Sequence, residues 1–388
     1  MSKMIDYMLL EIQEQPKFLK ELLDSQKEKI HEKVTSIVDN NNIKRIVLTG
    51  CGDSYCAALT GEYAFAKQSY ETQVIFPMEL SRYRCGFSNF LNEKTLLIPI
   101  SVSGRTPRVI ETVHAAKSKN CSVLSITNNP ESPLALFSDD YIYAKSSKFE
   151  TLTTTSYEGE ISSKYIGYEH DVPQTKSYTA VQMTLLLIAL SLQKDPNFEV
   201  LKNIPDTVSK IVDNKKLKEL GIKSSESDRF IYCASGPNYG NSLFAEFKMY
   251  EFSLMGFSKD IEEYCHTNYF ITEENKPVMF IAPEGESLSR LSEITPILKE
   301  KIKAEPIILS NKEPNFEYGN WIEIPYSGLE EYSVIPYGIA PPIFAFWVAK
   351  EKGLNVNTFR GGVEQEKYVE GSYYTIRESK IKDDYINQ

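Results

Sequence analysis

The hydrophobic positions of this chain fall into short runs that each end in small or polar residues. IVLTG at residues 46–50 and TLLIPI at residues 95–100 are two such runs. Further strands are predicted near residues 74–76, 122–127, 141–144, 306–309 and 321–325, with helical stretches between them. Short apolar strands that alternate with helices are typical of doubly wound parallel sheets. The sequence therefore predicts an α/β fold of α-β-α sandwiches, preceded by a helix over residues 15–39.

An internal repeat divides the predicted elements into two sets. VLTGCGDS (47–54) aligns with IYCASGPN (231–238), which places Gly52 on Gly236, and IPISVSGRT (98–106) aligns with MFIAPEGES (279–287), which places Gly104 on Gly285. Self-similarity of this kind indicates two tandem domains. The expected organisation is an N-terminal helical segment (1–35), a first domain (36–195), a polar linker (196–227) and a second domain (228–388).

The strand-to-helix turn of the first copy has the composition of an anion cup. Ser101, Ser103 and Thr106 offer hydroxyl donors, and Gly104 allows the backbone to approach a ligand closely. Thr106 is a predicted N-cap and Pro107 the first helical residue, so free N–H groups face the same spot. A phosphate is the expected ligand, and the alternative is a helix cap that binds nothing.

A second turn, Cys51-Gly52-Asp53-Ser54, follows the neighbouring strand. In an open parallel sheet, ligands bind outside the carboxyl ends of the strands, where such loops lie side by side. The Gly-x-Gly at this turn lacks the third glycine of a dinucleotide fingerprint, and Asp53 would repel a pyrophosphate. We therefore exclude NAD and expect no cofactor.

Together these loops resemble the sugar isomerase (SIS) domain, whose strand ends carry a CGxS turn and an SxSGxT phosphate loop. The matches here are CGDS (51–54) and SVSGRT (101–106), followed by NNPESPL (128–134). The run EHDVPQTKSYT (169–179) resembles the family's E(x)6KxxT segment, and AEFKMYE (245–251) resembles the catalytic helix of double-SIS isomerases. Residues 9–22 resemble the segment before the isomerase half of glucosamine-fructose-6-phosphate aminotransferase. The resemblance to the double-SIS phosphosugar isomerase and aminosugar deaminase family covers nearly the whole chain.

The resemblance implies a role for each matching residue. In a bound sugar phosphate, the phosphate would be held by Gly52, Ser54, Ser101, Ser103 and Thr106, and the sugar would be lined by Glu169, Val172 and Gln174. Glu251 would shuttle a proton between C1 and C2, supported by Lys248 on the predicted helix 239–254, where the two residues share a face. From spacing alone, an exposed ion pair on a surface helix is the alternative.

His266 lies in Glu263-Tyr264-Cys265-His266, which partly resembles the family's ELKH element. That resemblance implies a histidine that opens the sugar ring and reaches the site from a neighbouring subunit, so a homodimer with shared active sites is expected. The Gly-Pro that follows in the family is Thr267-Asn268 here. His170, inside the E(x)6K segment, is the substitute candidate.

The expected function is a phosphosugar isomerase or aminosugar-phosphate deaminase that works through an enediol or enolamine without a metal. Ser372 aligns with the family's Schiff-base lysine and Lys367 is out of register, which favours proton transfer over covalent ketose activation. Met1-Ser2-Lys3 has no cysteine at position two, so amidotransferase activity is not expected. The alternatives are a fructosamine 6-phosphate deglycase, a phosphosugar sensor without turnover and an inactive paralogue. The insert at residues 145–168 is interpreted as a lid or an interface.

Composition and charge limit the kinds of partner that this protein is expected to bind. The net charge of −10 argues against nucleic acid, since a binder of DNA or RNA needs a basic face. The sequence shows no signal segment and no apolar run of membrane-spanning length. The six cysteines lack metal-ligand spacing, which is typical of reduced thiols in a cytoplasm.

Overall fold

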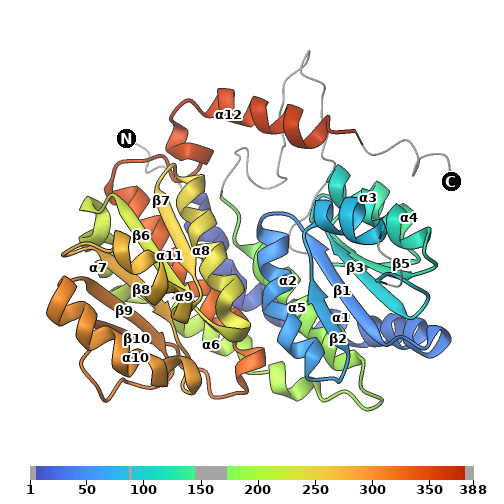
Figure 1. The fold of residues 1–388 in the computed structure, drawn as a ribbon, viewed down its shortest axis with the longest axis horizontal. Coiled ribbons are helices and arrows are strands. Elements are labelled where there is room, and N and C mark those ends of the chain that lie inside the picture. The colour runs from blue at the N-terminus through green and yellow to red at the C-terminus, as the bar shows by residue number, and fades with distance from the viewer. Residues whose placement is uncertain (1–5, 87–89, 145–172, 381–388) are drawn as a thin grey trace. The chain divides into compact units, whose positions relative to one another are not determined.

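The computed structural model describes residues 6–86, 90–144 and 173–380, which form two compact units (Figure 1). The β1–β5 unit comprises residues 18–171, 176–199 and 364–388, and the β6–β10 unit comprises residues 1–17, 172–175 and 200–363. The helix α1 (Tyr7–Asn41) contributes its first residues, up to Lys17, to the β6–β10 unit and the rest to the β1–β5 unit. It begins eight residues before the predicted helix does.

The β1–β5 unit contains a five-stranded sheet with the order β2-β1-β3-β4-β5, and every pairing in it is parallel. The strand order reverses between β1 and β3, which makes their carboxyl ends the switch point of the sheet. The strands are β1 (Arg45–Gly50), β2 (Glu71–Val74), β3 (Thr95–Ile100), β4 (Ser122–Thr127) and β5 (Asp140–Tyr143).

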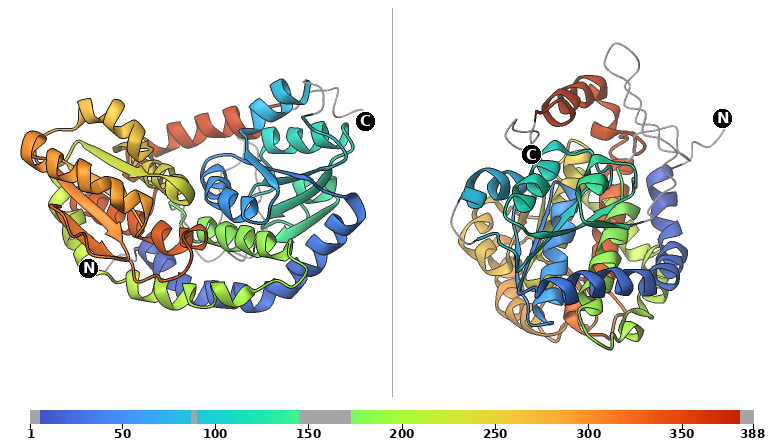
Figure 2. Two further views of the ribbon diagram at one scale, coloured as in Figure 1. Left: turned by 60° about the horizontal axis from the view of Figure 1, so that its bottom comes forward. Right: turned by 90° about the vertical axis from the view of Figure 1, so that its right-hand side faces the viewer.

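Helices cover both faces of this sheet (Figures 1 and 2). On one face, alternate strand residues such as Val47, Leu97 and Val123 pack against the apolar side of α3. On the other, α2 packs against α5. The side chains of alternate strand residues point to opposite faces, so the nearly continuous apolar runs of the sequence are those of strands buried on both faces. The helices of the unit are α2 (Asp53–Ala66), α3 (Pro107–Lys117), α4 (Pro133–Phe137), α5 (Lys176–Ser191) and α12 (Gln365–Ser372).

The β6–β10 unit repeats this architecture. Its sheet has the order β10-β9-β8-β6-β7, again parallel throughout and again reversing between its first and third strands. The strands are β6 (Arg229–Ala234), β7 (Met255–Lys259), β8 (Pro277–Ile281), β9 (Glu305–Ser310) and β10 (Asn320–Glu323). The helices are α6 (Ile204–Ile211), α7 (Lys215–Lys223), α8 (Tyr239–Glu251), α9 (Ile261–His266), α10 (Glu286–Ile297) and α11 (Val334–Glu351).

The predicted repeat and fold class are confirmed by this topology. Gly52 and Gly236, which the sequence aligned, both have positive φ (55° and 59°) directly after the equivalent strands β1 and β6. Gly104 and Gly285 likewise have positive φ (64° and 137°) after β3 and β8. The two sheets are therefore copies of one doubly wound unit.

The expected linear boundaries differ from the units, and two of the differences concern long segments. Residues 196–227, expected as a polar linker, include α6 and α7, which pack on α11 inside the β6–β10 unit. Many residues of this segment are charged, but its apolar residues repeat at helical spacing. Ile204, Val208 and Ile211 are examples, and all three are buried. Residues 364–380, expected in the second domain, group with the β1–β5 unit.

Two long-range contacts in the β6–β10 unit fix the start of α1. The backbone N–H of Tyr7 donates to Oδ1 of Asn357, 350 residues later, at 2.8 Å. Lys350 of α11 forms an ion pair with Asp6. Within the described ranges, no helix has the length and apolar character needed to cross a bilayer.

Candidate functional site

The two loops expected to form the anion cup begin at the same edge of the β1–β5 sheet. Gly50 and Ile100, the last residues of β1 and β3, are register partners. A Cβ at Gly50 would lie 2.9 Å from Cβ of Ser54 and 3.2 Å from the carbonyl oxygen of Ile100. The missing side chain at Gly50 therefore makes room for Ser54 beside the end of β3, at the switch point of the sheet.

The hydroxyls of the loop after β3, residues 101–106, lie together. Oγ of Ser101, which is 4 % exposed, is 3.1 Å from Oγ1 of Thr106 and 3.5 Å from Oγ of Ser103. Thr106 is the N-cap of α3 and Pro107 its first residue, as predicted, but the Thr106 side chain caps no backbone N–H. Its hydroxyl lies against Ser101 instead, while the N–H of Val109 in the first turn of α3 donates to the Thr106 carbonyl at 3.0 Å.

Gly104 permits the loop to pack on the next strand end. A Cβ at this position would lie 2.0 Å from Oγ of Ser132 and 2.8 Å from Oγ1 of Thr127. Ser132 in turn caps α4, where its side chain accepts from the N–H of Ala135. Residues 128–134, which the sequence analysis matched to the same family pattern, thus pack against the loop at residues 101–106 through Ser132.

Two arginines accompany the cup. Arg108 pairs with Glu111, whose fully buried carboxylate also accepts from Nε of Arg82 at 3.0 Å. Arg105 follows Gly104 directly; its buried Nε has no hydrogen-bond partner among the described residues. The helix N-termini of α2 and α3 add partial positive charge, so this sheet edge has the electrostatics of an anion site.

Lys248 and Glu251 form an ion pair on α8 in the β6–β10 unit. Nζ of Lys248 lies 2.7 Å from the Glu251 carboxylate, at the predicted three-residue spacing. The Lys248 side chain is 0 % exposed and that of Glu251 is 21 % exposed. A surface ion pair, the alternative that spacing alone left open, does not describe this buried ammonium, which must be held by partners to remain charged.

The other partner of Lys248 is a backbone carbonyl. Nζ donates to the carbonyl oxygen of Gln174 at 2.9 Å and lies 4.8 Å from the ring centroid of Phe244. Gln174 is the described member of the three predicted sugar-lining residues, and it contacts Lys248 through its main chain. Glu169 and Val172, together with His170 and the insert at residues 145–168, lie outside the described residues.

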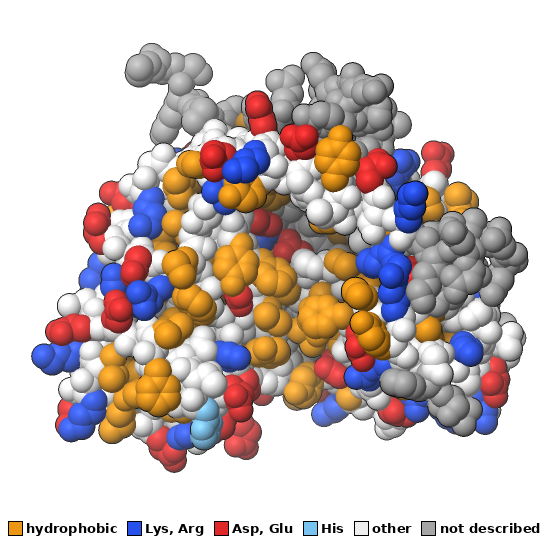
Figure 3. Space-filling view, turned by 45° about the horizontal axis from the view of Figure 1, so that its top comes forward, with side chains coloured by type: hydrophobic (Ala, Val, Ile, Leu, Met, Phe, Trp, Pro, Cys, Tyr) orange, Lys and Arg blue, Asp and Glu red, His pale blue; other side chains and the backbone are white. Residues whose placement is uncertain are grey.

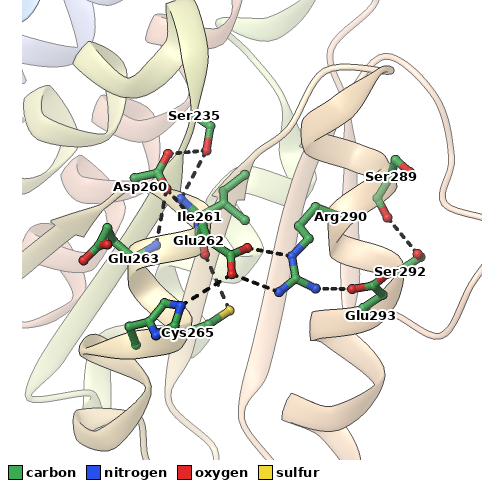
Figure 4. A network of polar contacts seen from close by, with 11 residues as sticks. Ser235, Asp260, Ile261, Glu262, Glu263, Cys265, Ser289, Arg290, Ser292 and Glu293 are labelled. Carbon is green, nitrogen blue, oxygen red and sulfur yellow. Dashed lines mark hydrogen bonds and ion pairs between the residues drawn. The ribbon is translucent and has the colours of Figure 1, made fainter.

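His266 ends α9 and is 67 % exposed. Its Nε2 lies 3.6 Å from Oε1 of Glu262, which also accepts from Nε of Arg290 at 2.8 Å. Figure 4 shows this network, in which Asp260 caps the start of α9 and Arg290 bridges Glu262 and Glu293. The Arg290 guanidinium lowers the pKa of Glu262. The predicted ring-opening histidine is thus on an exposed helix end.

Three further residues, His114, Lys367 and Ser372, have simpler surroundings. His114 is half-buried on α3 beside Phe137, and burial lowers its pKa. Lys367 of α12 lies 5.6 Å from the ring centroid of Tyr368, and Ser372 is the last residue of that helix. No described group of three His, Cys, Asp or Glu side chains could hold a metal ion.

Glu330, which was not predicted as a site residue, lies at the second copy of the cup. A Cβ at Gly236 would lie 3.9 Å from Oε1 of Glu330, and a Cβ at Gly285 would lie 3.9 Å from its Oε2. Burial raises the pKa of Glu330, and the charges of Glu331 and Glu286 raise it further. Glu284, by contrast, pairs with Lys312. A carboxylate of the chain itself therefore lies beside both turn glycines of the second copy.

Acidic and basic side chains are interspersed over the face shown in Figure 3, which differs from the basic stripe of a nucleic-acid binder.

Two copies of a doubly wound parallel sheet, one with a hydroxyl-lined loop at its switch point, define a class of tandem α/β proteins. The SIS domain pattern matches residues 41–157.

Relatives and solved structures agree with that match. Glutamine–fructose-6-phosphate aminotransferase [isomerizing] of Pyrococcus horikoshii is 28% identical over 360 residues, covering 90% of this chain and 55% of the relative. The chain thus spans about half the length of that curated relative. The C-terminal domain of glucosamine-fructose-6-phosphate aminotransferase from Francisella tularensis has the same fold (TM-score 0.72, 23% identity, 91% of this chain, 98% of that chain). So does tagatose-6-phosphate ketose/aldose isomerase from Escherichia coli (TM-score 0.71, 17% identity, 90% and 93%). Residues 41–157 thus match the SIS domain, and most of the chain is similar to part of an isomerizing aminotransferase.

Proposed function

We propose that this protein is a phosphosugar isomerase or aminosugar-phosphate deaminase that moves a proton between C1 and C2 of a hexose or hexosamine 6-phosphate. The observation that carries the proposal is the buried Lys248–Glu251 pair, because a buried ion pair on α8 costs desolvation free energy that a purely structural role would not require. The names of the relatives support a sugar-phosphate substrate.

The proposed phosphate ligands are Ser54, Ser101, Ser103, Thr106 and the backbone around Gly52. The hydroxyls of Ser103 and Thr106 lie 3.5 Å and 3.1 Å from that of Ser101, close enough for these three to donate to one phosphate. Hydrogen bonds to a charged group contribute about 1.5–3 kcal/mol each. Binding of the remote phosphate would thus supply the affinity that positions the reacting carbons.

Glu251 is the proposed base. Its carboxylate would remove the proton from C1 of a ketose phosphate, leaving an enediol, and return it to C2 to give the aldose. With an amino-aldose phosphate, proton removal from C2 gives an enolamine, which tautomerises to an imine whose hydrolysis releases ammonia and the ketose phosphate. The Lys248 ammonium would stabilise the negative charge that develops on the enediol oxygen. His266 of a second copy is the proposed group that protonates the ring oxygen.

Deuterium incorporation tests this proposal. Fructose 6-phosphate, tagatose 6-phosphate and glucosamine 6-phosphate are incubated in D2O with the protein, NMR follows C1 and C2, and a coupled assay follows ammonia. Wild-type protein is expected to exchange at least one substrate. Glu251→Gln should lose about 10²–10⁴-fold in the exchange rate. A parallel reaction with glutamine and fructose 6-phosphate tests the amidotransferase reaction named for the relatives.

The competing proposal is a phosphosugar sensor, for which binding occurs without exchange. Calorimetric binding of a hexose 6-phosphate, combined with no deuterium in any product and no ammonia, would favour the sensor. Absence of both binding and exchange across the panel would contradict both functions.

A further inference from the structure

A buried carboxylate far from Glu251 in the sequence is connected to the catalytic pair. Glu11, on the first turns of α1, is 5 % exposed, and its Oε2 accepts from the backbone N–H of Thr175 at 2.6 Å and from the Thr175 hydroxyl at 3.0 Å. Gln15, one turn further along the same helix face and also buried, donates from Nε2 to the same hydroxyl at 3.0 Å. All of these residues belong to the β6–β10 unit.

The N–H that Glu11 binds and the carbonyl that Lys248 binds belong to one peptide group. The peptide between Gln174 and Thr175 donates its N–H to the Glu11 carboxylate at 2.6 Å and accepts from Nζ of Lys248 at 2.9 Å. A carboxylate on the N–H side increases the negative charge on the carbonyl oxygen, because hydrogen bonds in series polarise one another. That oxygen thereby becomes a stronger acceptor for the Lys248 ammonium.

The fixed position of this peptide matters because Lys248 is fully buried and has a long side chain. An ammonium on a four-carbon stem has many rotamers, and ordering it costs conformational entropy. Two acceptors, the Gln174 carbonyl and the Glu251 carboxylate, restrict it. The carbonyl can do so only if residues 174 and 175 are themselves held, and these residues have no helical or strand structure of their own.

We propose that Glu11 is a positioning residue for the catalytic pair, acting through the Gln174–Thr175 peptide on Lys248 and thereby on Glu251. Gln15 completes the arrangement by binding the Thr175 hydroxyl. The inference rests on the proposed function, since it assigns Glu11 to the proton-transfer reaction; the hydrogen bonds themselves are structural findings.

Glu11→Gln tests the proposal, because it keeps the shape and one acceptor oxygen but removes the charge that polarises the peptide. We expect kcat for deuterium exchange to fall about tenfold with KM within about twofold of wild type, the signature of a group that acts on the reacting centre and not on substrate binding. The acidic limb of the kcat–pH profile should move to higher pH, because a less restrained ammonium stabilises the Glu251 carboxylate less. Glu14→Gln is the matched control, because it makes the same change at an exposed position of the same helix.

A second pair of variants covers the case in which Glu11→Gln does not fold. Thr175→Val removes the hydroxyl that joins Glu11 and Gln15 and should reproduce the loss in kcat, whereas Thr175→Ser keeps the hydroxyl and should restore it to within about twofold of wild type. Equal kcat values and pH profiles for wild type and Thr175→Val, or for wild type and a folded Glu11→Gln, would overturn the proposal.

A spectroscopic measurement separates failure of this inference from failure of the proposed function. The 15Nζ signal of Lys248, assigned with Lys248→Met, reports the hydrogen bonds of the ammonium whether or not any sugar turns over. If wild-type protein exchanges no substrate, the proposed function fails, but a shifted or broadened Lys248 signal in Thr175→Val and not in Glu14→Gln would still support positioning. An unchanged signal would overturn it.

Discussion

The hydroxyl of Thr106 lies 3.1 Å from the hydroxyl of Ser101 and does not cap the helix that Thr106 begins. A helix N-cap normally satisfies one of the first N–H groups with its own oxygen. Here the Thr106 hydroxyl caps no N–H group, and the N–H of Val109 donates to the Thr106 carbonyl. The Ser101 and Thr106 hydroxyls lie together at the end of β3, where both could donate to an anion.

The first prediction concerns these donors. Ser101→Ala combined with Thr106→Ala should weaken binding of glucose 6-phosphate by about 1.5–3 kcal/mol for each hydrogen bond lost to the charged phosphate. Titration calorimetry measures the change. Ser118→Ala is the control, because its hydroxyl binds a carbonyl at the other end of α3. Unchanged affinity in the double variant would show that the phosphate binds elsewhere.

The second prediction compares two glycines at the cup. Gly52 has φ 55° and ψ −130° but open space around its missing Cβ, so Gly52→Ala should cost only backbone strain, about 1–3 kcal/mol. Gly104→Ala adds a collision with Ser132 to the strain at φ 64°. We expect Gly104→Ala to lower the thermal unfolding midpoint well below that of Gly52→Ala. Equal midpoints would contradict the packing described for Gly104.

The third prediction follows from the raised pKa of Glu330. A carboxyl group whose pKa is raised by folding is protonated in both states at low pH, so its cost appears only as the pH rises from the usual glutamate range through the folded pKa. Glu330→Gln removes that cost. Its unfolding midpoint should exceed that of wild type at about pH 8 and converge with it near pH 4, a range that brackets the usual glutamate pKa.

Glu284→Gln provides the contrast for Glu330→Gln. Glu284 pairs with Lys312 on an exposed part of the unit, so neutralising it should not stabilise the protein at high pH. A pH-independent difference between Glu330→Gln and wild type would mean that the stability effect does not arise from the Glu330 charge.

The fourth prediction tests the proposed homodimer. If His266 serves a site on a second copy, chains carrying Glu251→Gln and chains carrying His266→Asn should complement one another on mixing. Half of the randomly formed dimers are mixed and each has one intact site of two, so on the order of a quarter of wild-type activity should return. If a labelled chain shows that subunits exchange and no activity returns, the proposal of a shared site is contradicted.

The fifth prediction separates the roles proposed for Lys248 and Glu251. Lys248→Met fills the buried volume without the ammonium and should slow deuterium exchange less than Glu251→Gln does, because a base that transfers the proton is harder to replace than a group that stabilises charge. Exchange rates from the same NMR assay decide the order. A greater loss in Lys248→Met would make the lysine the principal proton-transfer group.

The sequence predicted the features that depend on neighbouring residues. The glycine turns at Gly52 and Gly104 and the Thr106-Pro107 helix start depend on backbone sterics within a few positions, and the structure has all three. The predicted end of α8 at residue 254 was wrong, because the helix ends at Glu251 and Ser253 takes a left-handed conformation (φ 61°). Leu254 then donates back to the carbonyl of Met249. A serine in this role gives no sequence signal comparable to glycine.

Long-range partners could not be predicted from the pattern. The Lys248–Glu251 spacing indicated a shared face, but its burial depends on the peptide at Gln174, 74 residues away. Glu330 approaches Gly236 and Gly285 across loops that share no local periodicity. The hydrophobic pattern of the sequence also did not predict β7, because most residues of this edge strand are only half-buried. Packing between distant segments decides such features, and single-sequence periodicity does not record it.

The hydrogen bond from Tyr7 to Asn357 has a consequence for how the chain is made. At a ribosomal rate of roughly 5–20 residues per second, Asn357 is synthesised about 20–70 s after Tyr7. The β1–β5 strands are synthesised within that interval, while the first turns of α1 must wait for their partners near residue 357. Nascent chains are thus exposed to premature pairing of that helix, and a chaperone that holds residues 7–17 would raise the yield of folded protein.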